Sequence, residues 1–155
     1  MQVLNETPLL KDAENPTELS RNAMLLWGIV LCGGKSSVKV KAFYDVLQDN
    51  NQERISAEDK DFPVNFNLMI DLAVKLVNEY ESHMSKQEPE HEWETLRKLD
   101  SMRETIAEEE FLDTVFGVNS NLKREEWEAS VLKSAKWIFD SNKVRAQIYA
   151  KLAKA

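Results

Sequence analysis

Apolar residues recur at helical spacing along most of the chain, and this periodicity restricts the fold more than any other feature of the sequence. The clearest example is Leu68, Leu72 and Leu76, which repeat every fourth residue in a pattern that starts near Pro63 and continues to about Glu81. Only four Gly and four Pro occur among 155 residues, so little interrupts such segments. The sequence therefore predicts an all-α fold.

The same spacing predicts helices on both sides of this segment. An N-cap at Thr17 and a stop at Gly33-Gly34 delimit the first helix, and the second begins at Ser36 or Ser37. Further helices are expected from about Glu90 to Ser101, around Phe111, from Trp127 to Ile138, and from Asp140 or Ser141 to Leu152.

Two stretches share one order of elements: an amphipathic helix, a short polar loop, a β-branched residue between small polar residues, and a second helix. They cover residues 44–59 and 96–111, with Ile55 and Ile106 at the β-branched position. One such unit cannot bury its apolar face alone, whereas two can cover one another. We expect Ile55 and Ile106 to pair across a minimal antiparallel bridge.

The second parts of these stretches, RISAED and TIAEEEFLDTVF, resemble the exit halves of EF-hand loops. Together with the long helix between them, they are similar to the C-terminal pair of the neuronal calcium sensor and calcineurin-B-like group, over roughly residues 41–121. The resemblance implies EF-hand-like paired helix-loop-helix units with extra N-terminal and C-terminal helices, the latter within residues 122–155. Residues 1–16 lack a clear period and are expected to form a flexible arm before one helical domain, residues 17–155.

The calcium ligands of an EF-hand are largely missing from the first loop. Such loops bind the ion through oxygens at positions one, three, five, seven, nine and twelve, with a Gly at position six. With Ile55 placed eighth, Asn50 stands third, Gln52 fifth and Asp59 twelfth, and only Asp59 brings a negative charge. The Gly is absent as well.

The second loop is also incomplete. It keeps Asp100 and Glu110 but is one residue short between them, and Met102 stands where an oxygen ligand is needed. Because calcium affinity follows the charge and number of ligands, we interpret Asn50, Gln52, Asp59, Asp100 and Glu110 as vestigial loop positions. We expect neither a bound metal nor a cofactor.

A pair without calcium implies a non-catalytic, calcium-independent adaptor or regulatory subunit that binds an amphipathic helix of a partner protein. The groove would be lined by Leu68, Met69, Leu72 and Leu76 of the long helix and by Leu96, Phe111 and Val115 opposite. Apolar residues at helical spacing are equally what an ordinary core requires. Two alternatives stay open, a structural helical subunit of a larger assembly and a genuine calcium sensor with atypical loops.

Charge is unevenly distributed and sets the C-terminal helix apart. Residues 78–113 carry 12 acidic and 4 basic side chains, net −8, whereas residues 114–155 carry 4 and 8, net +4. Lys143, Arg145, Lys151 and Lys154 surround the apolar residues Val144, Ile148 and Leu152. This helix is expected to occupy the chain's own groove, to bind a partner, to rest on an anionic membrane surface, or simply to pack on the bundle.

Other chemistry finds little support in the sequence. The net charge of −7 argues against nucleic-acid binding, and the single Cys32 excludes a disulfide framework. The Gly-Lys-Ser segment 34–36 lacks the glycine spacing of a phosphate-binding loop. A hydrolase would have to use acidic clusters such as residues 108–110, which more simply complement a helix start, so we expect no enzyme. The start of the chain lacks a secretory leader pattern, which favours a cytoplasmic location.

Overall fold

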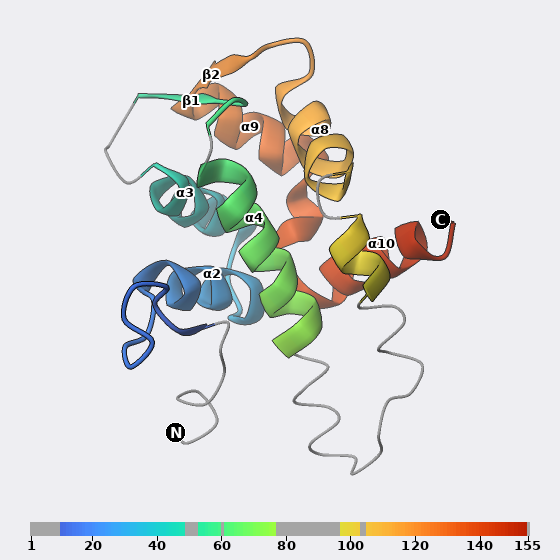
Figure 1. The fold of residues 1–155 in the computed structure, drawn as a ribbon. Coiled ribbons are helices and arrows are strands. Elements are labelled where there is room, and N and C mark those ends of the chain that lie inside the picture. Colours follow the sequence, from blue (N-terminus) through green and yellow to red (C-terminus); the bar gives the residue numbers. More distant parts are fainter. Residues whose placement is uncertain (1–9, 49–52, 60, 77–96, 103–104, 155) are drawn as a thin grey trace.

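The computed structural model describes residues 10–48, 53–59, 61–76, 97–102 and 105–154, and most of them are helical, as predicted. The described elements are α2 (Arg21–Leu31), α3 (Ser36–Leu47), β1 (Arg54–Ser56), α4 (Asp61–Asp71), the π-helical η2 (Leu72–Leu76) and η3 (Ile106–Leu112), α8 (Asp113–Phe116), β2 (Asn121–Lys123), α9 (Arg124–Ser134), the 3-10 helix η4 (Lys136–Phe139) and α10 (Ser141–Leu152). Figure 1 shows the two strands at one end of the molecule and α2 and α10 at the other, with α4 running between.

The two strands form a short antiparallel ladder, but with a different partner from the one predicted. Ile55 lies opposite Leu122, and Ser56 lies opposite Asn121. The predicted pairing of Ile55 with Ile106 is wrong, because Ile106 begins η3 and is buried there on a helical face. Burial on a helix therefore outweighs the local preference of a β-branched residue for a strand.

The strand pair joins two helix–strand–helix units. The first is α3–β1–α4 and the second is η3 and α8, then β2 and α9. Across the pair, α3 contacts α9 and α4 contacts η3, so that each unit packs on the other. The second unit thus starts later in the chain than the predicted segment 96–111.

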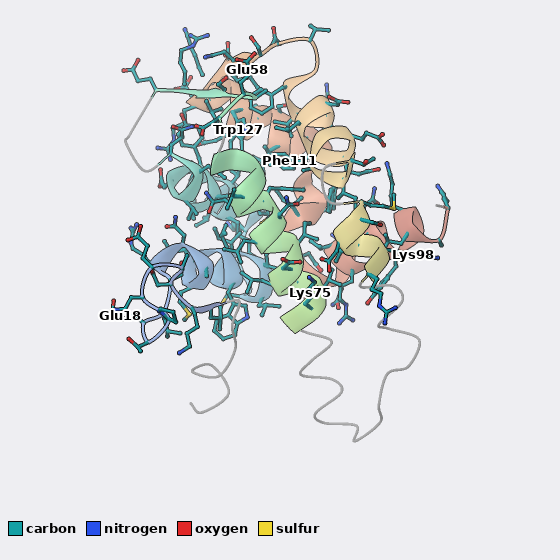
Figure 2. The ribbon with its side chains drawn as sticks, in the orientation of Figure 1. Glu18, Glu58, Lys75, Lys98, Phe111 and Trp127 are labelled. Atoms are coloured by element: carbon teal, nitrogen blue, oxygen red, sulfur yellow. The ribbon has the colours of Figure 1, made fainter. Side chains whose placement is uncertain are left out.

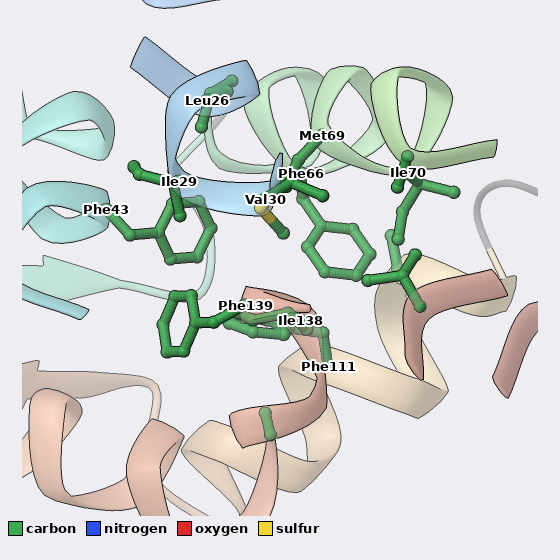
Figure 3. Packing of buried hydrophobic residues seen from close by; sticks show 14 of the residues in the cluster. Leu26, Ile29, Val30, Phe43, Phe66, Met69, Ile70, Phe111, Ile138 and Phe139 are labelled. Atoms are coloured by element: carbon green, nitrogen blue, oxygen red, sulfur yellow. The ribbon is translucent and has the colours of Figure 1, made fainter. Parts of the chain in front are cut away.

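One aromatic ring from each of four helices meets in the centre of the fold. Phe66 of α4 and Phe111 of η3 have ring centroids 4.7 Å apart, and Phe43 of α3 lies 5.7 Å from Trp127 of α9. Phe111 is also 6.1 Å from Phe43 and 6.5 Å from Trp127. Figure 3 shows Phe43, Phe66 and Phe111 among the aliphatic core residues. This aromatic cluster holds the two units together, because such rings contribute beyond the area that they bury.

Arg124 fastens α9 to α3 at the surface above this core. Its Nη1 lies 2.9 Å from Oδ1 of Asp45, its Nε donates to Oε1 of Glu128 at 2.8 Å, and its guanidinium stacks 4.7 Å from the centre of the Tyr44 ring. Burial raises the pKa of Tyr44, although the charge of Arg124 acts in the opposite direction. Arg124 thus combines an ion pair with a cation–π contact.

The N-terminal segment is held to the bundle from residue 10 onward. Leu10 is fully buried, its carbonyl oxygen accepts a hydrogen bond from the Ser20 N–H at 2.8 Å, and Lys11 pairs with Leu19 in an isolated bridge. The N-cap of α2 is Ser20 and not Thr17, since the Ser20 hydroxyl accepts from the Ala23 N–H. Within the expected N-terminal arm, Leu10, Asp12 and Asn15 thus take part in backbone hydrogen bonds with residues 18–20.

Candidate partner-binding surface

The residues predicted to line a groove form part of the core. Met69, Leu72 and Phe111 are fully buried, Val115 is nearly so, and Leu68 packs half-buried against them. The side chains of Leu76 and Leu96 lie outside the described residues. In this conformation the residues predicted to line the groove are covered by other parts of the chain. One of the covering segments is a helix.

That segment is α10, the basic C-terminal helix. Asp140 caps it, as predicted, by accepting hydrogen bonds from the N–H groups of Asn142 and Lys143. Its apolar stripe of Val144, Ile148 and Leu152 is buried, and the helix contacts both η2 and η4. Since η2 contains Leu72, α10 lies on the very segment from which the groove was predicted.

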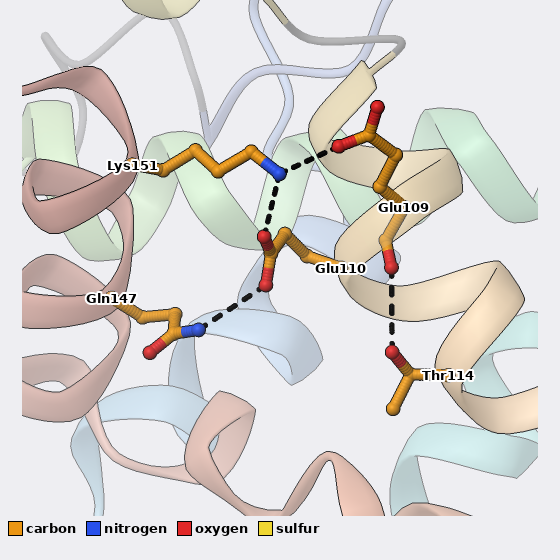
Figure 4. Close-up of polar contacts among 5 residues, drawn as sticks. All are labelled: Glu109, Glu110, Thr114, Gln147 and Lys151. Carbon is orange, nitrogen blue, oxygen red and sulfur yellow. Dashed lines mark hydrogen bonds and ion pairs between the residues drawn. The ribbon is translucent and has the colours of Figure 1, made fainter. Parts of the chain in front are cut away.

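A polar cluster fixes the outer side of α10 to η3. The Lys151 ammonium lies 2.7 Å from Oε2 of Glu109 and 2.7 Å from Oε1 of Glu110, and the Gln147 amide donates to Oε2 of Glu110 at 3.2 Å (Figure 4). The Thr114 hydroxyl donates to the carbonyl oxygen of Glu109 at 3.3 Å. The hydrogen bond that Lys151 donates to Glu110 lowers the pKa of this carboxyl group, and the hydrogen bonds that Lys151 donates to Glu109 and Glu110 raise its own pKa.

Replacing Lys151 with glutamine should raise the pKa of Glu110 toward that of an ordinary carboxyl group. A carboxyl whose pKa is lowered by folding stabilises the fold above its unfolded pKa of about 4.3, and this contribution disappears as the pH falls through the folded pKa. The wild type should thus lose a part of its stability below about pH 4 that the variant does not have. Carboxyl ¹³C NMR against pH measures the shift directly. Lys143→Gln is the control on the same helix, and an unchanged Glu110 titration in Lys151→Gln would contradict the contact.

The sequence shows both the acidic residues and the lysine of this cluster, but it does not predict that they contact one another. The acidic run at residues 108–110 was interpreted as a helix start, and Lys151 as one cation of a basic helix. The sequence feature that could have predicted their contact is charge: the segment around residues 108–110 is acidic, the C-terminal helix is basic, and each carries an apolar stripe. Spacing along the chain does not show that the segments meet, because about 40 residues separate Glu110 from Lys151.

The vestigial loop positions do not converge on a common point where the structure describes them. Asp100 pairs with Lys75 at 2.8 Å, Glu110 pairs with Lys151, and Oδ2 of Asp59 accepts from the Gln48 amide at 3.4 Å. Asn50 and Gln52 lie outside the described residues. Figure 2 shows Lys75, the partner of Asp100, in the lower part of the bundle, far from the strand end where Glu58, the neighbour of Asp59, lies.

The described residues of the predicted second loop are mostly helical. Residues 97–101 are helical and so are residues 105–116, so Asp100 and Glu110 belong to helical segments. The strand that pairs with β1 is β2, so the loop equivalent to the first one is the loop that precedes and includes β2. If Leu122 takes the eighth position of an EF-hand loop, as Ile55 does in the first, Gly117 is third, Asn119 fifth and Glu126 twelfth. Glu126 is engaged at the start of α9, where it accepts from the Lys123 N–H at 2.8 Å. Over the ranges described above, no group of three or more His, Cys, Asp or Glu residues is placed to hold a metal.

Titration of chelator-treated protein with Ca²⁺ should therefore give no saturable heat below about 10⁻⁴ M, the range in which sensor loops bind. The carboxylates that the loops still carry are few and partly engaged by lysines or helix ends. Calorimetry measures the heat, and tryptophan emission on the same sample reports any conformational response. Asp59→Asn is the matched variant and should leave both signals unchanged. A saturable heat that Asp59→Asn removes would restore the calcium sensor as the better interpretation.

The candidate surface thus consists of an apolar helix stripe and a lysine–glutamate cluster beside it. In the part of the chain that is described, no helix is long and apolar enough to cross a bilayer. Comparison of the chain with family models, with curated proteins and with solved structures finds no match in any of the three.

Proposed function

We propose that the chain is a non-catalytic, calcium-independent, EF-hand-like module of the cytoplasm that binds an amphipathic helix of a partner protein. Its own C-terminal helix, α10, then occupies the binding surface in the absence of the partner. The observation that carries the proposal is the position of α10, which buries an apolar stripe on η2 and places one lysine between two glutamates of η3.

The manner in which α10 is held supports exchange for another helix. Its stripe of three buried apolar residues at spacing four is of the kind that a helix presents to a hydrophobic groove. The ion pairs with Glu109 and Glu110 are at the surface, with Glu109 more than half exposed, and such pairs contribute only about 0–1 kcal/mol each. A partner helix with the same stripe and one matching cation could make the same contacts, but it would have to exceed the affinity of α10 to overcome the advantage of the tethered helix.

Two features support the EF-hand-like part of the proposal. The chain has two helix–strand–helix units that are joined by an antiparallel strand pair, and helices of each unit pack on the other. Neither loop carries the full set of oxygen ligands in sequence, whether the second loop is placed before Phe111 or before β2. A module of this kind would hold its surface in one state without an ion.

A labelled peptide with the sequence of residues 140–154 tests the proposal, with the full-length chain as receptor. Ile148→Asp should undock α10, and the free surface should then bind the peptide at least about tenfold more tightly than the wild type does, since a tethered helix no longer competes. Fluorescence anisotropy measures the binding. The proposal fails if the folded variant binds the peptide no better than the wild type.

The controls separate undocking from unfolding. Ala146→Asp introduces the same charge on the exposed side of α10 and should leave peptide binding at the wild-type level. A peptide that itself carries Ile148→Asp should not bind. If circular dichroism shows that the Ile148→Asp protein is unfolded, Lys151→Glu provides a milder variant, which removes the contacts with Glu109 and Glu110 and leaves the apolar stripe intact.

A further inference from the structure

A second surface of the molecule has features that the helix-binding proposal does not use. An open depression of about 310 Å³ lies where the turn between α2 and α3 meets the junction of η4 and α10. The residues that line it include Gly34, Ser36, Lys39, Lys136, Asp140 and Lys143. Three of these residues are lysines, each from a different element, in a protein whose net charge is −7.

None of the three lysines is neutralised by a carboxylate within the described ranges. The Lys39 ammonium donates to the carbonyl oxygen of Phe139 at 2.7 Å, which uses one of its three N–H groups and leaves two. Neither Lys136 nor Lys143 has an ion pair within 4 Å in the described part of the chain. Since like charges around one depression repel, a bound anion would lower the energy of this arrangement.

The one carboxylate of the depression is already engaged. Oδ1 of Asp140 accepts hydrogen bonds from the N–H groups of Asn142 at 3.0 Å and Lys143 at 3.2 Å, and so caps α10. With three ammonium groups against one carboxylate, the depression keeps a net positive charge. The contact of Lys39 with Phe139 also brings α3 to the start of α10, so the site is assembled from segments 100 residues apart.

The turn between α2 and α3 borders the lysines through Gly34. Gly34 has a φ of 145°, which L-residues rarely adopt, and a Cβ built there would lie 3.9 Å from Cε of Lys39. The backbone conformation at this point, and not a lack of space, therefore favours glycine. Ser36 adds a hydroxyl at the same rim.

From this cluster we propose that Lys39, Lys136 and Lys143 form a binding site for the phosphate groups of a small phosphorylated molecule. Lysine binds phosphate as a point charge. Three lysines around one open depression can contact a diphosphate group from several sides, which lysines on a flat surface cannot do. The site includes Asp140 and Lys143 at the start of α10, so it is complete only while α10 is docked as in this structure, but it requires no partner helix. The segment 34–36 thus takes part in a site although it lacks the spacing of a nucleotide-binding loop.

Isothermal calorimetry with sodium pyrophosphate on the full-length chain at low salt tests this site. The double variant K136Q/K143Q should bind pyrophosphate about a hundredfold more weakly, because each charge-assisted contact contributes about tenfold or more. Lys39 is left in place because it also supports the fold through Phe139. The matched control K41Q/K133Q removes two exposed lysines that do not line the depression and should bind within about twofold of the wild type.

Two further arms identify the source of the phosphate. Vesicles of phosphatidylcholine with phosphatidylinositol phosphates are tested for co-sedimentation with the wild type and both double variants. The site is supported if the wild type and K41Q/K133Q bind pyrophosphate and K136Q/K143Q does not. If K136Q/K143Q also loses binding to the vesicles, a lipid headgroup reaches the same site. Absence of pyrophosphate binding, or equal loss in both variants, overturns the proposal, and so does vesicle binding without pyrophosphate binding.

Discussion

Replacing Phe111 by alanine should lower the free energy of unfolding by about 3–5 kcal/mol, the usual cost of removing a buried aromatic ring. Phe111 is fully buried and contacts the rings of Phe66, Phe43 and Trp127, which come from three different helices. The cavity would lie where the two helix–strand–helix units meet, and neither unit can close it alone. Urea unfolding, followed by circular dichroism and by tryptophan emission, measures the change.

Two companion variants decide what such a loss means. Phe111→Leu keeps most of the volume and should cost clearly less, about 1–2 kcal/mol. Val118→Ala removes a side chain that is fully exposed and should stay within about 0.5 kcal/mol of the wild type. If Phe111→Ala cost no more than Val118→Ala, Phe111 would line an open groove and would not belong to the core.

Ile148→Asp should lower the free energy of unfolding by about 3–4 kcal/mol. The loss cannot exceed the free energy with which α10 docks on the bundle. The side chain is completely buried in the stripe of α10, and an aspartate there would be a buried charge with no partner. Undocking is cheaper than burial of that charge, so we expect the helix to leave the bundle while the rest of the fold persists. Hydrogen exchange should show fast amide exchange confined mainly to residues 141–152, whereas the same amides should be protected in the wild type.

The comparison variant is Ala146→Asp, which has the same change of charge at an exposed position two residues away. It should leave both the stability and the exchange pattern of α10 nearly unchanged. Cooperative loss of the whole fold in Ile148→Asp would contradict a separately docking helix. It would show that α10 is an integral part of the core.

The elements that the sequence predicted well are those set by local chemistry. The helix that starts at Ser36, the strand position of Ile55 and the cap at Asp140, one of two residues predicted for it, are confirmed, because caps, turn residues and apolar spacing act within one turn of the chain. The cap of α2 was misplaced by three residues since Thr17 and Ser20 are both good caps. The contact of the Ser20 backbone with Leu10 favours the second.

What the sequence could not show depends on contacts between distant segments. Ile106 sits in a strand-like context, yet whether it is in a strand depends on the presence of a partner strand, and β2 at Asn121–Lys123 takes that place. The apolar stripes were recognised, but whether a stripe faces a groove or a core depends on what covers it. Here α10 covers it, and Lys151 meets Glu109 only once both helices are packed.

The ladder between β1 and β2 has a consequence for how the chain acquires its structure during synthesis. The residues that it brings together are 67 positions apart, so a large loop must close before the ladder forms. Until α9 has left the ribosome, Phe43 and Phe111 lack the ring of Trp127 that covers them, and their apolar surface stays exposed. A nascent chain that stalls before residue 121 would thus be a substrate for chaperones, and release would follow completion of the last fifth of the sequence.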